Sequence, residues 1–195
     1  MYSVELLIKE HKCILDFNRL IREICCRVID GNDVDIKLMR ECVDFGRSFA
    51  DKHHHSKEEK VLFRIMLDEL GSIADKIING GMLIEHDLGR FHLSELEKAI
   101  NRYDESHDRN AKLDVIMNAS AYGSLLKRHI EKEDSVIFEY AKRSLNGNAK
   151  HKADVKTEEF EMNARKNGVP DKYLGWLYTK LKEFNLPAER KTLDF

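Results

Sequence analysis

Six residues of the sequence have side chains that bind metal ions and recur at one fixed spacing. They are His11, His54, Glu58, His86, His129 and Glu133. The first three return as the last three, each 75 positions further along the chain. Imidazole nitrogens and carboxylate oxygens are common ligands of zinc, iron and manganese. The spacing predicts two related halves, each of which contributes two histidines and one glutamate to a metal site.

The number and kinds of these side chains favour two metal ions over one. Histidine and glutamate four positions apart lie on one face of a helix. Two carboxylates in a helical core are costly unless a cation balances them. Four imidazoles and two carboxylates exceed the four ligands of a tetrahedral zinc site. They suit two ions that each take two histidines, with Glu58 and Glu133 bridging. Mixed nitrogen and oxygen ligands favour iron, then manganese, with zinc as a further alternative.

The run His53-His54-His55 leaves open which histidine is the ligand. His54 is favoured by the repeat and by its spacing to Glu58, while the competing register pairs His55 with Glu59. In the favoured register the neighbouring histidines are solvated or lie outside the ligand set.

Three further residues have two interpretations each. Glu10 and Glu85 precede ligand histidines, and they either accept hydrogen bonds from ligand imidazoles or are solvated. Tyr122 lies two turns before His129, and it is either a group next to the ligands or part of the core.

Long helices are expected to position these residues. No proline occurs before Pro170, and apolar residues at helical spacing favour uninterrupted helices. The predicted helices cover about residues 3–29, 35–70, 76–104 and 110–146. Because short connections make consecutive helices antiparallel neighbours, the predicted fold is all-α, an up-down-up-down four-helix bundle over residues 1–147. Counted from the helix ends at about 1.5 Å per residue, the six ligands fall at one level of the bundle.

Residues 148–195 follow a different pattern and are predicted to form a helical C-terminal extension. Residues 148–156 are polar, residues 160–165 suit a short helix, and a second helix opens at Pro170. We expect this extension to pack on the bundle or to form a surface for a partner.

The motifs resemble those of the hemerythrin-like HHE cation-binding family. They are Glu10-His11, His54-His55-Ser56-Lys57-Glu58-Glu59, Glu85-His86 and His129-Ile130-Glu131-Lys132-Glu133-Asp134. The resemblance covers about residues 1–146 and implies a non-haem centre of two iron ions, bridged by Glu58 and Glu133 and by an oxo or hydroxo group. Members of the family bind or sense dioxygen, respond to nitric oxide or oxidative stress, or help to repair iron centres. The expected function is to bind or sense dioxygen, nitric oxide or a related oxidant. The alternative is iron-centre repair or reduction of such oxidants, so enzymatic activity stays open.

One departure from the family pattern bears on function. Oxygen-carrying hemerythrins have another histidine one turn from the ligand of the third helix, but Arg90 and Met82 stand one turn after and before His86. One iron would then keep an open position, which disfavours simple oxygen carriage. Arg90 is a candidate to face the site and hold an anion. The alternative is a surface side chain or a salt bridge with Glu58, Glu133 or Glu85.

Composition excludes several other classes of protein. Lys and Arg number 33 and Asp and Glu 35, a net charge of −2, which gives no footprint for nucleic acid and no polybasic membrane signal. No apolar run approaches the length of a spanning helix, and the N-terminus does not resemble a signal peptide. We expect a cytoplasmic protein, monomeric or homodimeric, whose partners are a small gaseous ligand or oxidant and a redox or protein partner at the extension.

The four cysteines form no C-x-x-C pair, which disfavours a disulfide framework or a thiolate zinc site.

Overall fold

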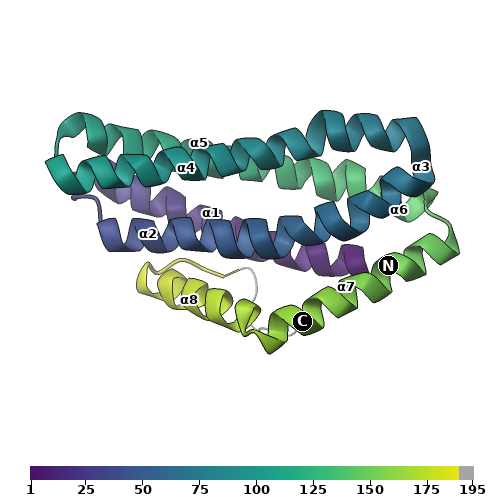
Figure 1. Cartoon of the computed structure of the whole chain (residues 1–195). Helices are drawn as coiled ribbons and strands as arrows, with labels where there is room; N and C mark the ends of the chain where they lie inside the picture. The colour runs from purple at the N-terminus through teal and green to yellow at the C-terminus, as the bar shows by residue number, and fades with distance from the viewer. Residues whose placement is uncertain (189–195) are drawn as a thin grey trace.

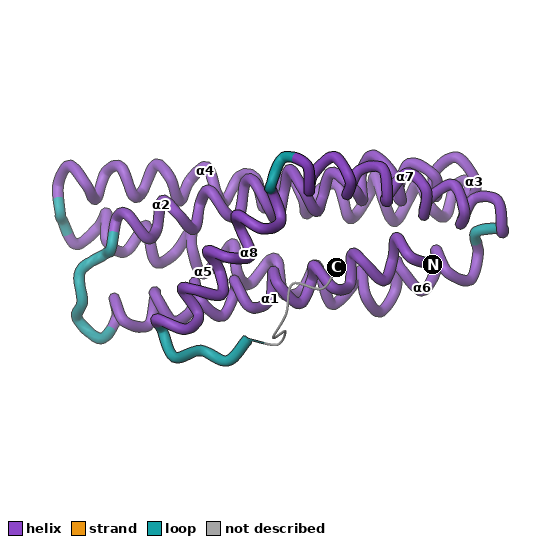
Figure 2. The backbone as a smooth tube through the Cα atoms, turned by 90° about the horizontal axis from the view of Figure 1, so that it is seen from below, coloured by secondary structure: helices purple, strands orange, loops and turns teal. Residues whose placement is uncertain are grey.

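The computed structural model describes residues 1–188, and all regular secondary structure within them is helical. The long helices run antiparallel in up-down-up-down order (Figure 1), as the sequence predicts. The connections at the ends of the bundle are short (Figure 2). No helix within the described residues is both long and apolar enough to cross a bilayer.

The long helices are divided into α-helical and π-helical segments. The first is α1 (Tyr2–Ile29). The second consists of α2 (Ile36–Phe45), η1 (Gly46–His55), η2 (Glu58–Leu62) and the first part of α3 (Phe63–Ile77). The third begins after a turn at Gly71 within α3 and continues through η3 (Ile78–Met82) and α4 (Leu83–Ser106). The fourth consists of α5 (Arg109–Lys132), η4 (Glu133–Ile137) and α6 (Phe138–Ser144).

Local signals account for where these helices begin and turn. The side chain of Asp35 accepts a hydrogen bond from the backbone N–H of Leu38, and Asp108 accepts two at the start of α5. Such caps satisfy amide groups that the helix itself leaves unpaired. Gly71 has φ +63° and ψ −143°, a conformation open mainly to glycine. The chain therefore reverses between the second and third helices without a long loop.

The C-terminal extension is more helical than the sequence suggested. Instead of a polar stretch and a short helix over 160–165, α7 runs from Gly147 to Lys166, and α8 covers Val169–Glu183. Asn146 caps α7 by accepting from the N–H of Ala149. The residues that α7 buries lie four apart and are mostly small or polar: Ala149, Ala153, Thr157 and Glu161. This narrow stripe packs α7 on the bundle, but it lacks the large apolar residues that reveal a buried helix face.

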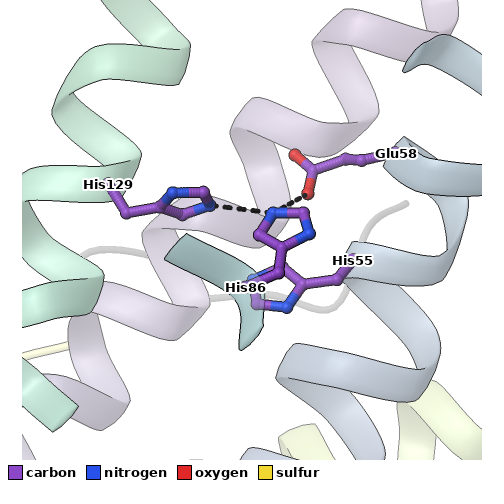
Figure 3. Close-up of side chains that lie close together, drawn as sticks. All are labelled: His55, Glu58, His86 and His129. Carbon is purple, nitrogen blue, oxygen red and sulfur yellow. Dashed lines mark hydrogen bonds and ion pairs between the residues drawn. The ribbon is translucent and has the colours of Figure 1, made fainter. Parts of the chain in front are cut away.

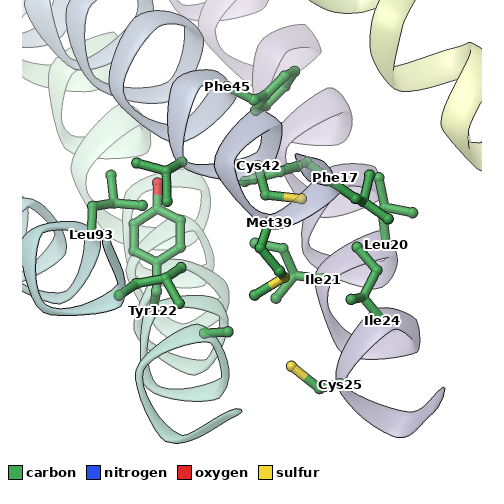
Figure 4. Packing of buried hydrophobic residues seen from close by; sticks show 14 of the residues in the cluster. Phe17, Leu20, Ile21, Ile24, Cys25, Met39, Cys42, Phe45, Leu93 and Tyr122 are labelled. Atoms are coloured by element: carbon green, nitrogen blue, oxygen red, sulfur yellow. The ribbon is translucent and has the colours of Figure 1, made fainter. Parts of the chain in front are cut away.

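Two apolar clusters fill the interior on either side of a polar layer. The larger one includes Phe17, Phe45 and Tyr122 (Figure 4) and extends to Leu177 of α8. The smaller one includes Val4 and Phe138 and extends to Ala153 of α7. The histidines and glutamates of the repeat lie in the layer between them, so the polar residues are enclosed by well-packed hydrophobic side chains.

Candidate metal centre

π-Helical segments position three of the six candidate ligands of the repeat: His54, Glu58 and Glu133. Their i→i+5 hydrogen bonds widen the turn, and such segments often occur at functional sites. The segment η1 carries His53, His54 and His55, all of which are buried. Glu58 opens η2 and Glu133 opens η4, so around the two glutamates the 75-residue repeat of the sequence is also a repeat of backbone conformation.

All six residues of the repeat meet in the polar layer, and both glutamates lie between the histidines. The imidazole Nε2 atoms approach Glu58 at 3.7 Å from His11, 3.4 Å from His54 and 3.6 Å from His86. They approach Glu133 at 3.3 Å from His11, 3.1 Å from His129 and 3.8 Å from His86. Each carboxylate thus has histidines of both halves beside it, the placement that a bridging ligand requires.

The structure adds His55 to the cluster. Its ring stacks on that of His86, with centroids 3.8 Å apart and planes at 7°, and His86 Nε2 lies 3.1 Å from His129 Nε2 (Figure 3). The ligand atoms form two groups whose members lie within 4.8 Å of one another. One group is His11, His54, Glu58 and Glu133, and the other is His55, Glu58, His86 and His129. His54 and His55 are therefore not alternative registers, because the two side chains belong to different groups.

Each of these five histidines is oriented by a carboxylate at its outer nitrogen. In every case Nδ1 is the atom bonded to the carboxylate. The pairs are His11 with Asp134 (2.7 Å), His54 with Glu10 (2.8 Å), His55 with Asp51 (3.4 Å), His86 with Glu59 (2.7 Å) and His129 with Glu85 (3.0 Å). When Nδ1 donates to a carboxylate, Nε2 carries the free lone pair, the arrangement that orients metal-binding histidines.

The orienting groups follow the same repeat as the inner ones. Glu59 and Asp134 are 75 positions apart, as are Glu10 and Glu85, and the distances within the paired contacts agree closely. His55 is the exception, since Ile130 stands at its position in the second half. Sequence reasoning identified Glu10 and Glu85 as candidates, but it assigned no role to Asp134 or to Asp51 as a histidine partner.

Several inner atoms are left without a hydrogen bond of good geometry. Both carboxylate oxygens of Glu58 and of Glu133 are buried without such a hydrogen bond, and so is His11 Nε2. Buried polar atoms are rarely left unpaired, and buried carboxylates are costly without a positive partner. Oxygen and imidazole donors that converge in this way fit divalent transition-metal ions.

The charges of the cluster shift the pKa values of its histidines. Burial opposes protonation of His86, but the adjacent carboxylates of Glu133 and Glu59 outweigh it and raise its pKa to about 9. Burial also opposes protonation of His129, but the charge of Glu133 outweighs it and raises its pKa to about 10. Burial and the neighbouring charge of His86 lower the pKa of His55 well below its ordinary value. In the absence of metal, protons on His86 and His129 thus balance the glutamates, as a bound cation would.

Arg90 does not face the centre, contrary to one of the two expectations. It pairs with Asp51 at 2.8 Å, with Glu59 at 2.6 Å and with Asp87 at 2.8 Å. It lies behind His55 and His86 and forms salt bridges with their carboxylate partners, Asp51 and Glu59. The salt bridges expected with Glu58, Glu133 or Glu85 are replaced by these. The reason is proximity, because Asp51 and Glu59 project toward α4 from the second long helix.

The structure places Tyr122 in the apolar core. Its hydroxyl lies 3.2 Å from where a Cβ atom would stand on Gly46, beside Leu93, and the ring belongs to the larger apolar cluster (Figure 4). Burial raises the pKa of its hydroxyl well above the ordinary value. Of the two interpretations of Tyr122, core packing is the one that matches this position.

A third group of side chains that could bind a metal ion is paired with a lysine instead. Glu10, His53 and Glu161 come together within the described part of the molecule, but the ammonium group of Lys57 bonds to both carboxylates and lies 3.1 Å from His53 Nε2. The lysine takes the place of a cation there, which leaves two metal positions in the polar layer.

Comparison with known families agrees with this geometry. Residues 2–141 match the family model of the hemerythrin HHE cation-binding domain. No curated protein and no solved structure gave a significant match. The match includes every histidine and glutamate of the two groups, and it leaves α7 and α8 outside. A helical bundle that encloses clustered histidines and glutamates, together with this match over most of the chain, shows that the protein belongs to the hemerythrin HHE cation-binding family.

Proposed function

We propose that the protein holds two iron ions and uses them to bind or sense dioxygen, nitric oxide or a related small oxidant. His11 and His54 would hold one ion, His55, His86 and His129 would hold the other, and Glu58 and Glu133 would lie between the two. Iron supplies electrons and open coordination positions for small oxidants, chemistry that the side chains of this layer lack.

One observation carries the proposal: five imidazoles turn Nδ1 to carboxylates, and four of them, His11, His54, His86 and His129, turn Nε2 toward two buried glutamates that lack good hydrogen bonds. A purely structural polar layer would pair its own donors and acceptors. This layer instead directs imidazole nitrogens and negative charge toward common points, which favours a metal centre over a hydrogen-bonded core network.

The two positions are unequal, and the difference indicates where an oxidant would bind. The position of His55, His86 and His129 has three nitrogen ligands, whereas that of His11 and His54 has two. Glu58 belongs to both groups, and Glu133 also lies 3.1 Å from His129 Nε2 and 3.8 Å from His86 Nε2. If both carboxylates bridge, the position of His11 and His54 has one protein ligand fewer. We infer that the open coordination position belongs to the iron held by His11 and His54.

The surroundings of that position are apolar on the side of His11 and suit a small uncharged ligand there. The ring of Phe138 stacks on that of His11 with centroids 5.4 Å apart. Phe138 belongs to the smaller apolar cluster, which continues to Leu7 and Val61. Such a lining limits access of water and of charged molecules, and a diatomic gas passes through it more readily than an anion does.

The first test is metal stoichiometry together with the optical spectrum. The protein is loaded with ferrous iron without oxygen, freed of excess metal and then exposed to air or to nitric oxide. We expect two irons per chain and a new charge-transfer band, and we expect His54→Ala to lose one iron together with the band. The exposed histidine variant His151→Ala serves as the control and should keep both.

Other outcomes of this test would redirect or end the proposal. One metal or none in the wild-type chain, with no change in the spectrum, contradicts a di-iron centre. Two irons that react repeatedly in the presence of a reductant, with consumption of the oxidant, would favour reduction over sensing. Transfer of the iron to an acceptor protein would favour the repair function.

A further inference from the structure

Four buried residues form a hydrogen-bonded network behind His54, here called the outer network: Glu10, His53, Lys57 and Glu161. Glu10 accepts hydrogen bonds from His54 Nδ1 at 2.8 Å and from His53 Nε2 at 3.0 Å. The ammonium group of Lys57 donates to Glu10 and to Glu161. Each member is at most 3% exposed. A continuous chain of polar contacts thus links α7 of the extension to a candidate metal ligand.

The second half of the repeat provides a natural comparison. There, Glu85 accepts from His129 at 3.0 Å and pairs with Lys132, as Glu10 does with His54 and Lys57. Lys132 is 50% exposed and Glu85 18% exposed. Arg128 stands at the position of His53, and no carboxylate of the described extension is paired with Lys132. The carboxylate–lysine pair is therefore common to both halves, whereas its burial beneath the extension belongs to the first half alone.

The packing of α7 explains how Glu161 reaches the network. The helix lies beside the bundle (Figure 1) and contacts α1, η2 and α3. Asp154 accepts hydrogen bonds from the backbone N–H of Ser3 at 2.9 Å and from its hydroxyl at 2.8 Å. Two helical turns further along, Glu161 is buried against Lys57 and lies 3.3 Å from His53.

The charge balance of the outer network gives Glu161 a specific role. A buried ammonium group needs carboxylate partners, and Lys57 has two. Without the charge of Glu161, Glu10 would be the one carboxylate left to pair with Lys57 in this network, and water would enter beside the ammonium group. Glu10 would then hold the imidazole of His54 less firmly, and carboxylates that orient metal-binding histidines contribute strongly to metal affinity.

We propose that Glu161 is a positioning residue through which the C-terminal extension secures one of the two metal positions, that of His11 and His54. The inference rests on the proposed function, since it concerns the same centre. It adds a role for the extension, which lies outside the matched family domain, and it makes the two metal positions depend on different parts of the chain.

The test measures release of iron from the full-length, iron-loaded chain. Ferrous protein is mixed with excess colorimetric chelator without oxygen, and the rates at which the two ions leave are recorded. Glu161→Gln keeps the shape of the side chain and removes its charge. We expect it to speed the release of one ion several-fold, less than the about 10- to 100-fold effect on affinity of removing a direct partner of a ligand, and to leave the other rate unchanged. Glu159→Gln, an exposed substitution on the same helix, should change neither rate.

A second comparison separates positioning from general loss of stability. In a His54→Ala background the remaining ion is held by His55, His86 and His129, and Glu161→Gln should no longer alter its release. Lys132→Gln should affect release from that position instead. If Glu161→Gln matches Glu159→Gln, or loosens both ions equally, the positioning role is wrong while the di-iron centre stands. A wild-type chain that binds no iron overturns both proposals.

Discussion

The five imidazoles of the polar layer differ from ordinary core histidines in how their two nitrogens are used. A core histidine satisfies each nitrogen with a nearby donor or acceptor. Here the outer nitrogen is satisfied by a carboxylate in all five cases, and the inner one faces other imidazoles and two glutamates. The orientation of each ring and the position of its inner nitrogen are thereby fixed before any metal binds, which reduces the reorganisation that binding requires.

The first prediction concerns His55, the ligand candidate without a counterpart in the repeat. His55→Phe keeps an aromatic ring stacked on His86 but removes the nitrogen. Because loss of even an outer partner lowers metal affinity by about 10- to 100-fold, this variant should bind one of its two ions at least about 10-fold more weakly. Competition with a chelator of known affinity measures the change. Equal affinity of His55→Phe and wild type for both ions would show that His55 only stacks.

At the scale of the element, the helices could be predicted from the sequence and their internal geometry could not. The helix bounds followed from apolar periodicity and from the absence of proline, and they lie close to the predicted ones. The π-helical turns of η1, η2 and η4 leave no comparable signal, because they need one extra residue per turn and no special residue type. For this reason His54 and His55 looked like alternatives in the sequence, although they point into different groups.

In the C-terminal extension, by contrast, the sequence pattern did not reveal the full length of a helix. The helix α7 was predicted only in part because its buried stripe contains alanine, threonine and glutamate in place of leucine or phenylalanine. Glu161 in particular reads as a solvated charge, and only the fold reveals that it meets Lys57. Polar residues buried by partners far away in sequence cannot be recognised from local spacing.

The second prediction concerns the glycine turn that separates the two helical hairpins. Gly71→Ala should destabilise the protein by about 1–3 kcal/mol, since the required backbone conformation is costly for residues with a Cβ atom. Space is not the reason, because nothing lies within 4 Å of a Cβ atom at this position. Gly80 has equally open surroundings but no positive φ, so Gly80→Ala should be neutral or stabilising by up to about 1 kcal/mol. Urea denaturation of both variants checks the contrast, and equal effects would contradict it.

For the molecule as a whole, a charged layer interrupts an otherwise hydrophobic interior. Burial of the apolar clusters on its two sides provides most of the free energy that favours folding. Burial of the charged layer opposes folding unless its charges are balanced. Metal ions and protons are two ways to balance them. The stability of the protein should therefore depend on metal and pH together.

The third prediction follows from the raised pKa values of His86 and His129. Their pKa values are about 9 and 10 in the folded, metal-free protein, against about 6.5 in an unfolded chain. Their contribution to stability is fully present below about pH 6.5 and is lost as the pH rises through 9 to 10, so metal-free protein should lose on the order of a few kcal/mol between pH 7 and 10.

Urea denaturation at several pH values measures this loss, and the iron-loaded protein serves as the comparison. Because metal ligation requires neutral imidazoles, the loaded protein should show little decline over the same range. Metal-free stability that is constant or rises from pH 7 to 10 would show that protons do not balance the glutamates.

The 75-residue repeat also bears on how such a protein could arise. One hairpin, α1 with the helix that follows it, carries two of the four repeated histidines and one of the two repeated glutamates. Two identical hairpins related by an axis parallel to the helices would complete a symmetric centre as a dimer of half-length chains. Fusion into one gene releases each half to change alone. The two halves differ at His55, whose counterpart is Ile130, and at Lys57, which pairs with Glu161 of the extension. In a symmetric dimer of identical chains, any such change would occur in both halves at once. In a fused chain the two candidate metal positions can thus differ, as the extra histidine on one side and the outer network on the other already do.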